Sequence, residues 1–326
     1  RMTIDDGAMI PRLAESLGYL REQGLELEEI DIHGLTPNDF EMQQPLIDGR
    51  VDVAYHWFQH SVFGARHDLP IKAVMAITDA PGMTVLVANR VKDQIRGAAD
   101  LKGRHVAEGA AYATKSTLMN YLALREGLAP RSYVAVAQQT AGRQEKIIQG
   151  LEAGGVDVVA CMEPQTAAIR ATQRVSTLYD LTSKAATTEL LGASLPSESL
   201  LMAPAFIEQQ PETAQRIVNA FVKTMRFVNS STAEQIADAL PSNYFEGKVR
   251  DAEIERIRNT LPSYAQGNYA FADKDVALLV DTIVKFPFDD SPAGQWRNTS
   301  LHSNLEPAAL YTNDLVLKAM QTFPAN

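Results

Sequence analysis

The order of apolar and polar positions over the first 200 residues alternates between two periods. Short apolar runs such as Val51–Tyr55, Ile71–Ile77 and Val156–Ala160 are typical of buried strands. Between them lie longer segments with apolar positions three or four residues apart, which are typical of helices. This alternation predicts an α/β fold with mostly parallel sheets and helices on both of their faces.

The predicted elements follow one another as strand and helix up to residue 181. We expect strands at 2–5, 27–33, 51–55, 71–77, 84–88, 104–107, 133–136, 156–160 and 177–181, and helices at 11–22, 39–48, 60–66, 115–125, 143–151 and 165–174. After about residue 200 the pattern becomes helical, with helices expected at 212–229, 232–240, 251–261, 273–286 and 314–320. The chain therefore combines an α/β part with a helical C-terminal addition.

One local pattern occurs twice. Residues 44–54 and 146–160 each begin as a short helix, continue through a glycine turn and end in a strand that opens Val-Asp-Val. Gly49 in the first copy, and Gly154 or Gly155 in the second, permit the positive φ that ends a helix. Two copies predict two α/β lobes of similar plan, and such lobes typically bind a ligand in the cleft between them.

Composition excludes several classes of protein. The formal net charge is −10, which argues against nucleic-acid binding because that function requires a basic surface. No apolar run approaches the roughly 20 residues of a membrane-spanning helix. Cys161 is the single cysteine, so no disulfide forms within the chain, and we expect it to be a small buried side chain.

Further segments carry a family resemblance together with the repeated pattern. They are Gly18–Glu28, Asp100–Ala107, Met162–Pro164, Phe206–Arg216 and Tyr311–Val316. In this order along the chain, they resemble the solute-binding proteins of ABC importers. The branch is the NMT1/THI5-like one, which takes up nitrate, taurine, aliphatic sulfonates and thiamine-precursor pyrimidines.

The resemblance implies a two-lobed periplasmic binding protein fold, type II-like, with no enzymatic activity and no cofactor. Lobe one would comprise residues 1–77 and 203–326, lobe two residues 84–197, and the hinge crossovers would lie near 78–83 and 197–202. The implied partners are a small-molecule solute and an ABC permease in the inner membrane, with the protein a monomer. The implied location is periplasmic, or extracytoplasmic as a lipoprotein, with the signal segment absent from this chain.

Strand ends provide the candidate site, because ligands of open α/β sheets bind beyond the carboxyl ends of the strands. The loops at these ends contain the candidate ligand-binding residues Met9, His33, Leu35, His56, Trp57, Thr78, Tyr112, Ala113, Thr114, Lys115, Gln138 and Glu163.

Two groups among these candidates point to a ligand class. Ala113, Thr114 and Lys115 stand at the start of a predicted helix, where free N–H groups and the helix dipole attract an anion. His56 and Trp57 offer flat surfaces for stacking. The first choice is an aromatic carboxylate or an organosulfonate, and a thiamine-precursor pyrimidine is the alternative.

Metal binding and catalysis find little support. His56 and His60 have the four-residue spacing of metal ligands, and His67 and Asp68 follow, but the segment lacks the glutamate of a His-Glu-x-x-His motif and any cysteine partner, so no metal site is predicted. The phosphate-loop, dinucleotide and nucleophile-elbow motifs are absent. The open alternatives are two-lobed enzymes of the menaquinone or pyrimidine-synthesis type, which share this fold, and a sensor that signals to a membrane kinase.

Overall fold

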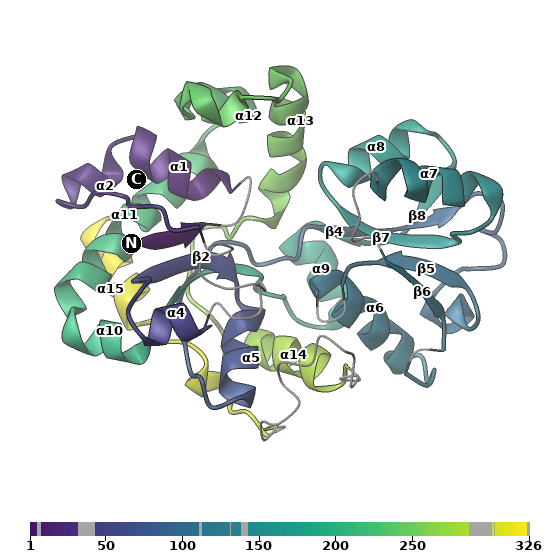
Figure 1. Ribbon diagram of the computed structural model, residues 1–326, viewed down its shortest axis with the longest axis horizontal. Helices are drawn as coiled ribbons and strands as arrows, with labels where there is room; N and C mark the ends of the chain where they lie inside the picture. Colours follow the sequence, from purple (N-terminus) through teal and green to yellow (C-terminus); the bar gives the residue numbers. More distant parts are fainter. Residues whose placement is uncertain are drawn as a thin grey trace.

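Two β-sheets form the centres of two halves of the molecule (Figure 1). The computed structural model describes residues 1–4, 8–31, 43–110, 113–130, 132–137, 143–286, 302 and 304–324. The first sheet has the strand order β1 (Met2–Ile4), β2 (Val53–Trp57), β9 (Glu198–Met202), β3 (Lys72–Ala76). The second has the order β6 (Val134–Ala137), β5 (His105–Glu108), β7 (Val158–Met162), β4 (Met83–Ala88), β8 (Val175–Leu181).

Helices surround both sheets. Those before β9 are α1 (Met9–Ser16), α2 (Tyr19–Glu22), α4 (Gln43–Ile47), α5 (Gln59–Arg66), α6 (Thr114–Arg125), α7 (Arg143–Ala153), α8 (Gln165–Ala171) and α9 (Lys184–Leu191). Those after β9 are α10 (Pro204–Gln209), α11 (Pro211–Ser230), α12 (Ala233–Ala239), α13 (Arg250–Thr260), α14 (Asp273–Val284) and α15 (Asp314–Thr322). Short 3₁₀ turns lie at Ala98–Leu101, Ser242–Phe245, Leu261–Ser263 and Pro307–Ala309. The predicted α/β class with a helical C-terminal addition is confirmed.

The sheets are mixed, so the expectation of mostly parallel sheets was wrong. Among the described strands, three pairings are parallel and four are antiparallel. The antiparallel pairings all involve β9 or β4, the strands at which the chain enters a new sheet. β9 inserts between β2 and β3 of the first sheet, and β4 inserts between β7 and β8 of the second. Elsewhere the strand–helix–strand connections give parallel pairs, as predicted.

Three local expectations also needed correction. The predicted helix 11–22 is divided into α1 and α2, because Gly18 between them has a φ of 76°. The predicted strand 27–33 is reduced, within its described part, to an isolated bridge between Glu29 and Met2. Glu198–Met202, expected at the second crossover, form β9 inside the first sheet, so the chain returns from the second sheet ahead of them.

The repeated pattern has the same structure in both copies. Gly49 and Gly154 have φ values of 70° and 89°, as predicted for residues that end a helix. Asp52 accepts a hydrogen bond from the amino group of Arg1, at the start of β1, at 2.7 Å. Asp157 accepts one from the backbone N–H of His105, at the start of β5, at 3.0 Å. Each aspartate therefore fixes the start of the neighbouring parallel strand.

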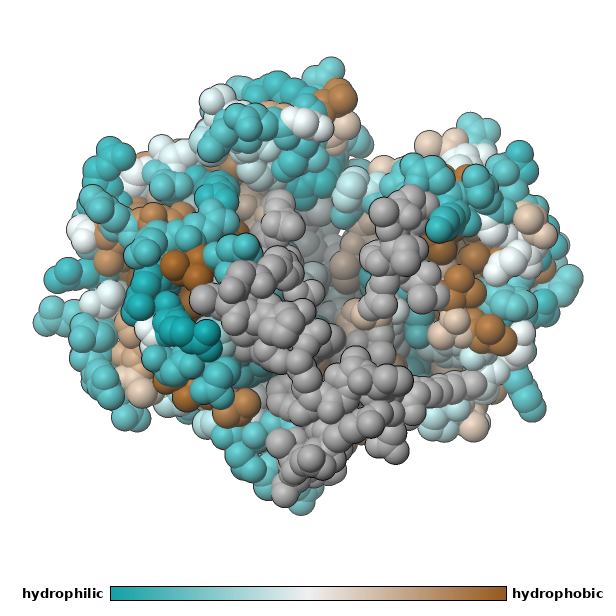
Figure 2. All heavy atoms as spheres, viewed as in Figure 1, coloured by the Kyte–Doolittle hydropathy of each residue, from teal (hydrophilic) through white to brown (hydrophobic). Residues whose placement is uncertain are grey.

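The tail is anchored to the first sheet by an apolar cluster. α11 begins with Pro211 in its first turn and presents one apolar face, which includes Phe221, to α1 and to the sheet. Phe221 and Tyr55 are both buried, with ring centroids 6.5 Å apart. The surface is indented between the two halves (Figure 2), and α13 borders this indentation on the side of the first sheet, facing α8 (Figure 1).

Candidate functional site

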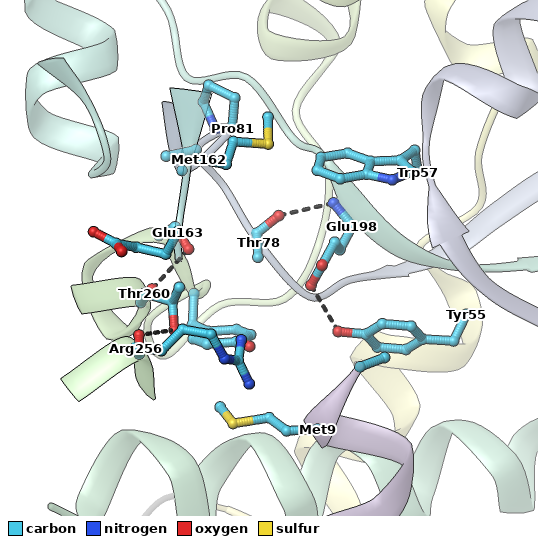
Figure 3. Close-up of a pocket in the computed structure, with 15 residues that line it drawn as sticks. Met9, Tyr55, Trp57, Thr78, Pro81, Met162, Glu163, Glu198, Arg256 and Thr260 are labelled. Carbon is cyan, nitrogen blue, oxygen red and sulfur yellow. Dashed lines mark hydrogen bonds between the residues drawn. The ribbon is translucent and has the colours of Figure 1, made fainter. Parts of the chain in front are cut away.

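A cavity of about 210 Å³ lies between the two sheets (Figure 3). Four predicted site residues line it: Met9, Trp57, Thr78 and Glu163. The other lining residues are Ala8, Tyr55, Ala80, Pro81, Gly82, Met162, Glu198, Arg256, Thr260, Ser263 and Tyr264. They come from the first sheet, the start of α1, the first crossover, the end of β7 and the segment around α13, so both halves of the chain line one partly open cavity.

The alternation of β2 decides which of its aromatic residues reach the cavity. Side chains two residues apart on a strand share a face, and Tyr55 and Trp57 both line the cavity. His56 points to the other face, where its ring meets that of His60 with centroids 4.5 Å apart. Its Nδ1 atom accepts the backbone N–H of Trp57 at 2.9 Å. Of the two predicted aromatic contacts, only Trp57 lies at this cavity.

Glu198 brings a carboxylate to the same wall. It is the register partner of Trp57 at the start of β9. The Tyr55 hydroxyl donates to Glu198 Oε2 at 2.7 Å, and the Glu198 backbone N–H donates to Thr78 Oγ1 at 2.8 Å. The sequence rule missed this residue because β9 is antiparallel, so its amino end lies at the edge where parallel strands end.

Arg256 of α13 brings a guanidinium to the opposite wall (Figure 3). Its Nε donates to Glu253 at 2.9 Å, and its Nη2 donates to the Tyr244 hydroxyl. Burial opposes the charge, but Tyr244 and Glu253 together hold the pKa of Arg256 above its ordinary value. No signal in the sequence distinguished Arg256 from the other charged residues of the helical tail.

Glu163 connects the second half of the molecule to α13. It follows β7 in the second half and accepts the backbone N–H of Ala167 at 3.3 Å. Its other oxygen accepts the Asn259 side-chain amide, from α13, at 3.4 Å. Burial raises the pKa of Glu163, and the hydrogen bonds oppose that shift. The Asn259–Glu163 contact joins the C-terminal addition to the second half beside the cavity.

Comparison with known proteins places this fold in a family. The sequence profile described as NMT1/THI5 like matches residues 10–233. The chain belongs to the NMT1/THI5-like family. A search of curated protein sequences finds no match.

Solved structures share the fold over nearly the whole chain. The sulfonate-binding protein SsuA from Methylobacillus flagellatus KT has a TM-score of 0.69 at 13% identity, covering 100% of this chain and 94% of that one. The nitrate-binding protein NrtA from Synechocystis PCC 6803 has a TM-score of 0.69 at 14% identity, covering 100% and 88%. The desulfurization enzyme DszB has a TM-score of 0.59 at 12% identity, covering 98% and 99%. These similarities concern the fold, which serves binding proteins and an enzyme alike.

The remaining predicted site residues of this NMT1/THI5-like protein lie outside the cavity or outside the described residues. Ala113 precedes α6, Thr114 donates to Gln59 Oε1 of α5 at 3.0 Å, and half-buried Lys115 follows in the first turn. The Thr114–Gln59 hydrogen bond joins α6 to α5, and Ala113, Thr114 and Lys115 are not among the residues that line this cavity. The other four, outside the described ranges, are His33, Leu35, Tyr112 and Gln138.

In the described ranges, no group of three or more His, Cys, Asp or Glu side chains could hold a metal ion. Cys161 is buried, as predicted, and burial raises the pKa of its thiol to about 11, which disfavours the reactive thiolate. No described helix combines the length and apolar character needed to span a bilayer.

His60 gives this family member a testable pH dependence. The ring is fully enclosed, and burial, followed by the nearby His56, lowers its pKa well below 6.5. Above pH 6.5 the neutral form is favoured in both folded and unfolded chains. As the pH falls below 6.5, the unfolded chain takes up a proton that the folded chain does not, so stability falls.

We expect His60 to contribute a loss of up to about 1.4 kcal/mol for each pH unit below 6.5. Urea unfolding at pH 7.5 and pH 5.5 measures the loss. In His60→Phe, which cannot titrate, the difference between the two pH values should shrink. An equal difference in both proteins would mean that His60 is not the titrating group.

Proposed function

We propose that this protein is the solute-binding component of an ABC importer. The observation that supports the proposal is the cavity lined by residues of both halves, including Trp57 of the first sheet and Glu163 after β7. A ligand held by both halves favours the closed arrangement by its differential affinity. A permease in the inner membrane would then recognise the closed protein. SsuA and NrtA, which share the fold, are described as periplasmic sulfonate-binding and nitrate-binding proteins.

The proposed hinge lies where the chain passes between the sheets. The first lobe would consist of residues 1–77 and 198–326, because β9 belongs to the first sheet, and the second of residues 84–191. Crossovers at 78–83 and at about 192–197 would join them. Backbone hydrogen bonds hold the two crossovers together: Leu195 N–H donates to the Asp79 carbonyl at 3.3 Å and Ser197 N–H to the Thr78 carbonyl at 3.2 Å. We propose an extracytoplasmic monomer, periplasmic or lipid-anchored.

The proposed ligand is a small organic anion, either an aromatic carboxylate or an organosulfonate. Trp57 provides a flat face for its body, and Arg256 provides a positive charge. An engineered cavity of about 150 Å³ binds benzene, so the 210 Å³ found in this protein suits one ring with a substituent.

A thiamine-precursor pyrimidine is the second candidate, supported by Glu198. A carboxylate beside an aromatic face can accept hydrogen bonds from the amino group of an aminopyrimidine. Under this alternative Glu198 is the main polar contact and Arg256 contributes little to binding.

We propose capture without chemistry, although DszB is an enzyme of the same fold. The only serine among the described lining residues is Ser263, and its hydroxyl donates to the Thr260 carbonyl at 2.7 Å, not to a base. A solute recovered after incubation should therefore have an unchanged mass. A mass change that requires the protein would favour the enzymes of the menaquinone or pyrimidine-synthesis type.

A thermal-shift panel of aromatic carboxylates, organosulfonates and pyrimidines tests the proposed function. A ligand that binds only the folded protein stabilises it by about 2.7 kcal/mol at 100 times its dissociation constant. We expect at least one member of the panel to raise the melting temperature in a concentration-dependent way. Divalent metal salts serve as the comparison. A shift with metals alone, or no shift with any solute, would contradict solute capture.

A further inference from the structure

We infer that Arg256 is the residue that selects for an acidic group on the ligand, and that this selectivity resides in α13. The inference rests on the proposed function and deepens it by assigning the anion's partner. The family profile ends at residue 233, so α13 lies beyond the part of the chain that it matches.

Arg256, Lys248 and Glu253 together carry a net positive charge at the α13 wall of the cavity. Glu253 is shared by two cations, Arg256 at 2.9 Å and Lys248 at 3.9 Å, so one carboxylate faces two positive groups. The side chains of Arg256 and Glu253 are only 17% and 12% exposed, so water screens this charge weakly.

The geometry of Arg256 suits recognition of an acid. Its contacts to Glu253 and Tyr244 use Nε and Nη2, and Nη1 takes part in neither. Figure 3 shows the guanidinium directed into the cavity. Because two contacts already fix its orientation, little side-chain freedom is lost when it binds a carboxylate or sulfonate. The N-terminal end of α1, through Ala8 and Met9, lines the same cavity and adds a favourable dipole.

The carboxylates of the cavity limit what this acid can be. Glu198 accepts the Tyr55 hydroxyl on the first-sheet wall, and Glu163, after β7, accepts two hydrogen bonds. An acidic group placed against either carboxylate would be repelled. Arg256 is the one described cation among the lining residues, so the acidic group must lie at α13.

Lys115 at the start of α6 is the rival partner. It belongs to the anion site that the sequence predicts, but it is not among the residues that line the cavity. If α6 holds the anion, removing the charge of Lys115 should abolish the preference for acids. If α13 holds it, removing the charge of Arg256 should do so.

The test compares matched acid and amide probes: benzoate with benzamide, and benzenesulfonate with benzenesulfonamide. Titration calorimetry gives the preference for the acid in the wild type and in Arg256→Gln, Arg256→Lys and Lys115→Gln. Arg258→Gln is the control, since Arg258 lies on the same helix, pairs with Glu234 and Glu255, and does not line the cavity. Melting temperatures establish that each variant is folded.

We expect the wild type and Arg258→Gln to prefer the acid by about tenfold or more, the size of one charge-assisted hydrogen bond. Arg256→Gln should reduce the preference to about threefold or less, and Arg256→Lys should keep part of it. A folded Arg256→Gln that keeps the full preference, or a wild type that binds amides as well as acids, would overturn the inference and leave solute capture standing. If the wild type binds none of the four probes, the aromatic-anion function fails as well.

Discussion

Replacing Trp57 by alanine should weaken solute binding by about 1–3 kcal/mol, which is roughly a factor of 5 to 150. Trp57 provides the largest flat surface in the cavity, and its loss removes both apolar contact area and a stacking face. The change should appear in the dissociation constant measured by calorimetry with the strongest solute from the thermal-shift panel.

His56→Ala is the matched control for Trp57→Ala. His56 is the neighbouring aromatic residue, but it lies on the opposite face of β2, against His60. The His56→Ala substitution should change the dissociation constant of the solute by less than about threefold. Equal losses in the two variants, or no loss in Trp57→Ala, would mean that the ligand does not bind at the Trp57 face.

Phe58→Ala should cost about 3–5 kcal/mol of unfolding free energy, the largest stability effect that we expect. Phe58 is completely buried and its ring packs against that of Phe271, with centroids 4.8 Å apart. Its backbone N–H donates to the Ser197 carbonyl at 2.6 Å, at the second crossover. Removing the ring therefore leaves a cavity where β2, the crossover and the tail meet.

Val249→Ala is the control for this substitution, because Val249 is 72% exposed and should change stability by less than about 0.5 kcal/mol. Urea unfolding followed by circular dichroism measures both variants. A loss below about 1 kcal/mol in Phe58→Ala would show that this junction contributes little to the stability of the fold.

The sequence predicted the repeated part of the fold because local rules determine it. Gly49 and Gly154 end their helices with positive φ, and each Val-Asp-Val leads into a strand beside a parallel neighbour. The prediction failed for strands whose pairing partners are distant in sequence. Nothing local to Glu198–Met202 shows that this segment inserts antiparallel between β2 and β3.

The same distinction applies to the cavity. The strand-end rule found Trp57, Thr78 and Glu163 because Trp57 is the last residue of β2 and the other two come just after β3 and β7. It could not separate Trp57 from His56 without the alternation of β2, which was available in the sequence. The strand-end rule could not find Glu198 or Arg256. Glu198 begins an antiparallel strand, and Arg256 belongs to α13, a helix that tertiary packing brings to the cavity.

A crystal structure of the protein with the strongest solute from the panel would test the central claim most directly. We expect the solute to lie between the two halves, with its flat body against Trp57 and its acidic group at Arg256. Solute bound elsewhere, for example in the groove between α11 and α15 that Lys223 and Phe323 line, would contradict capture between the lobes.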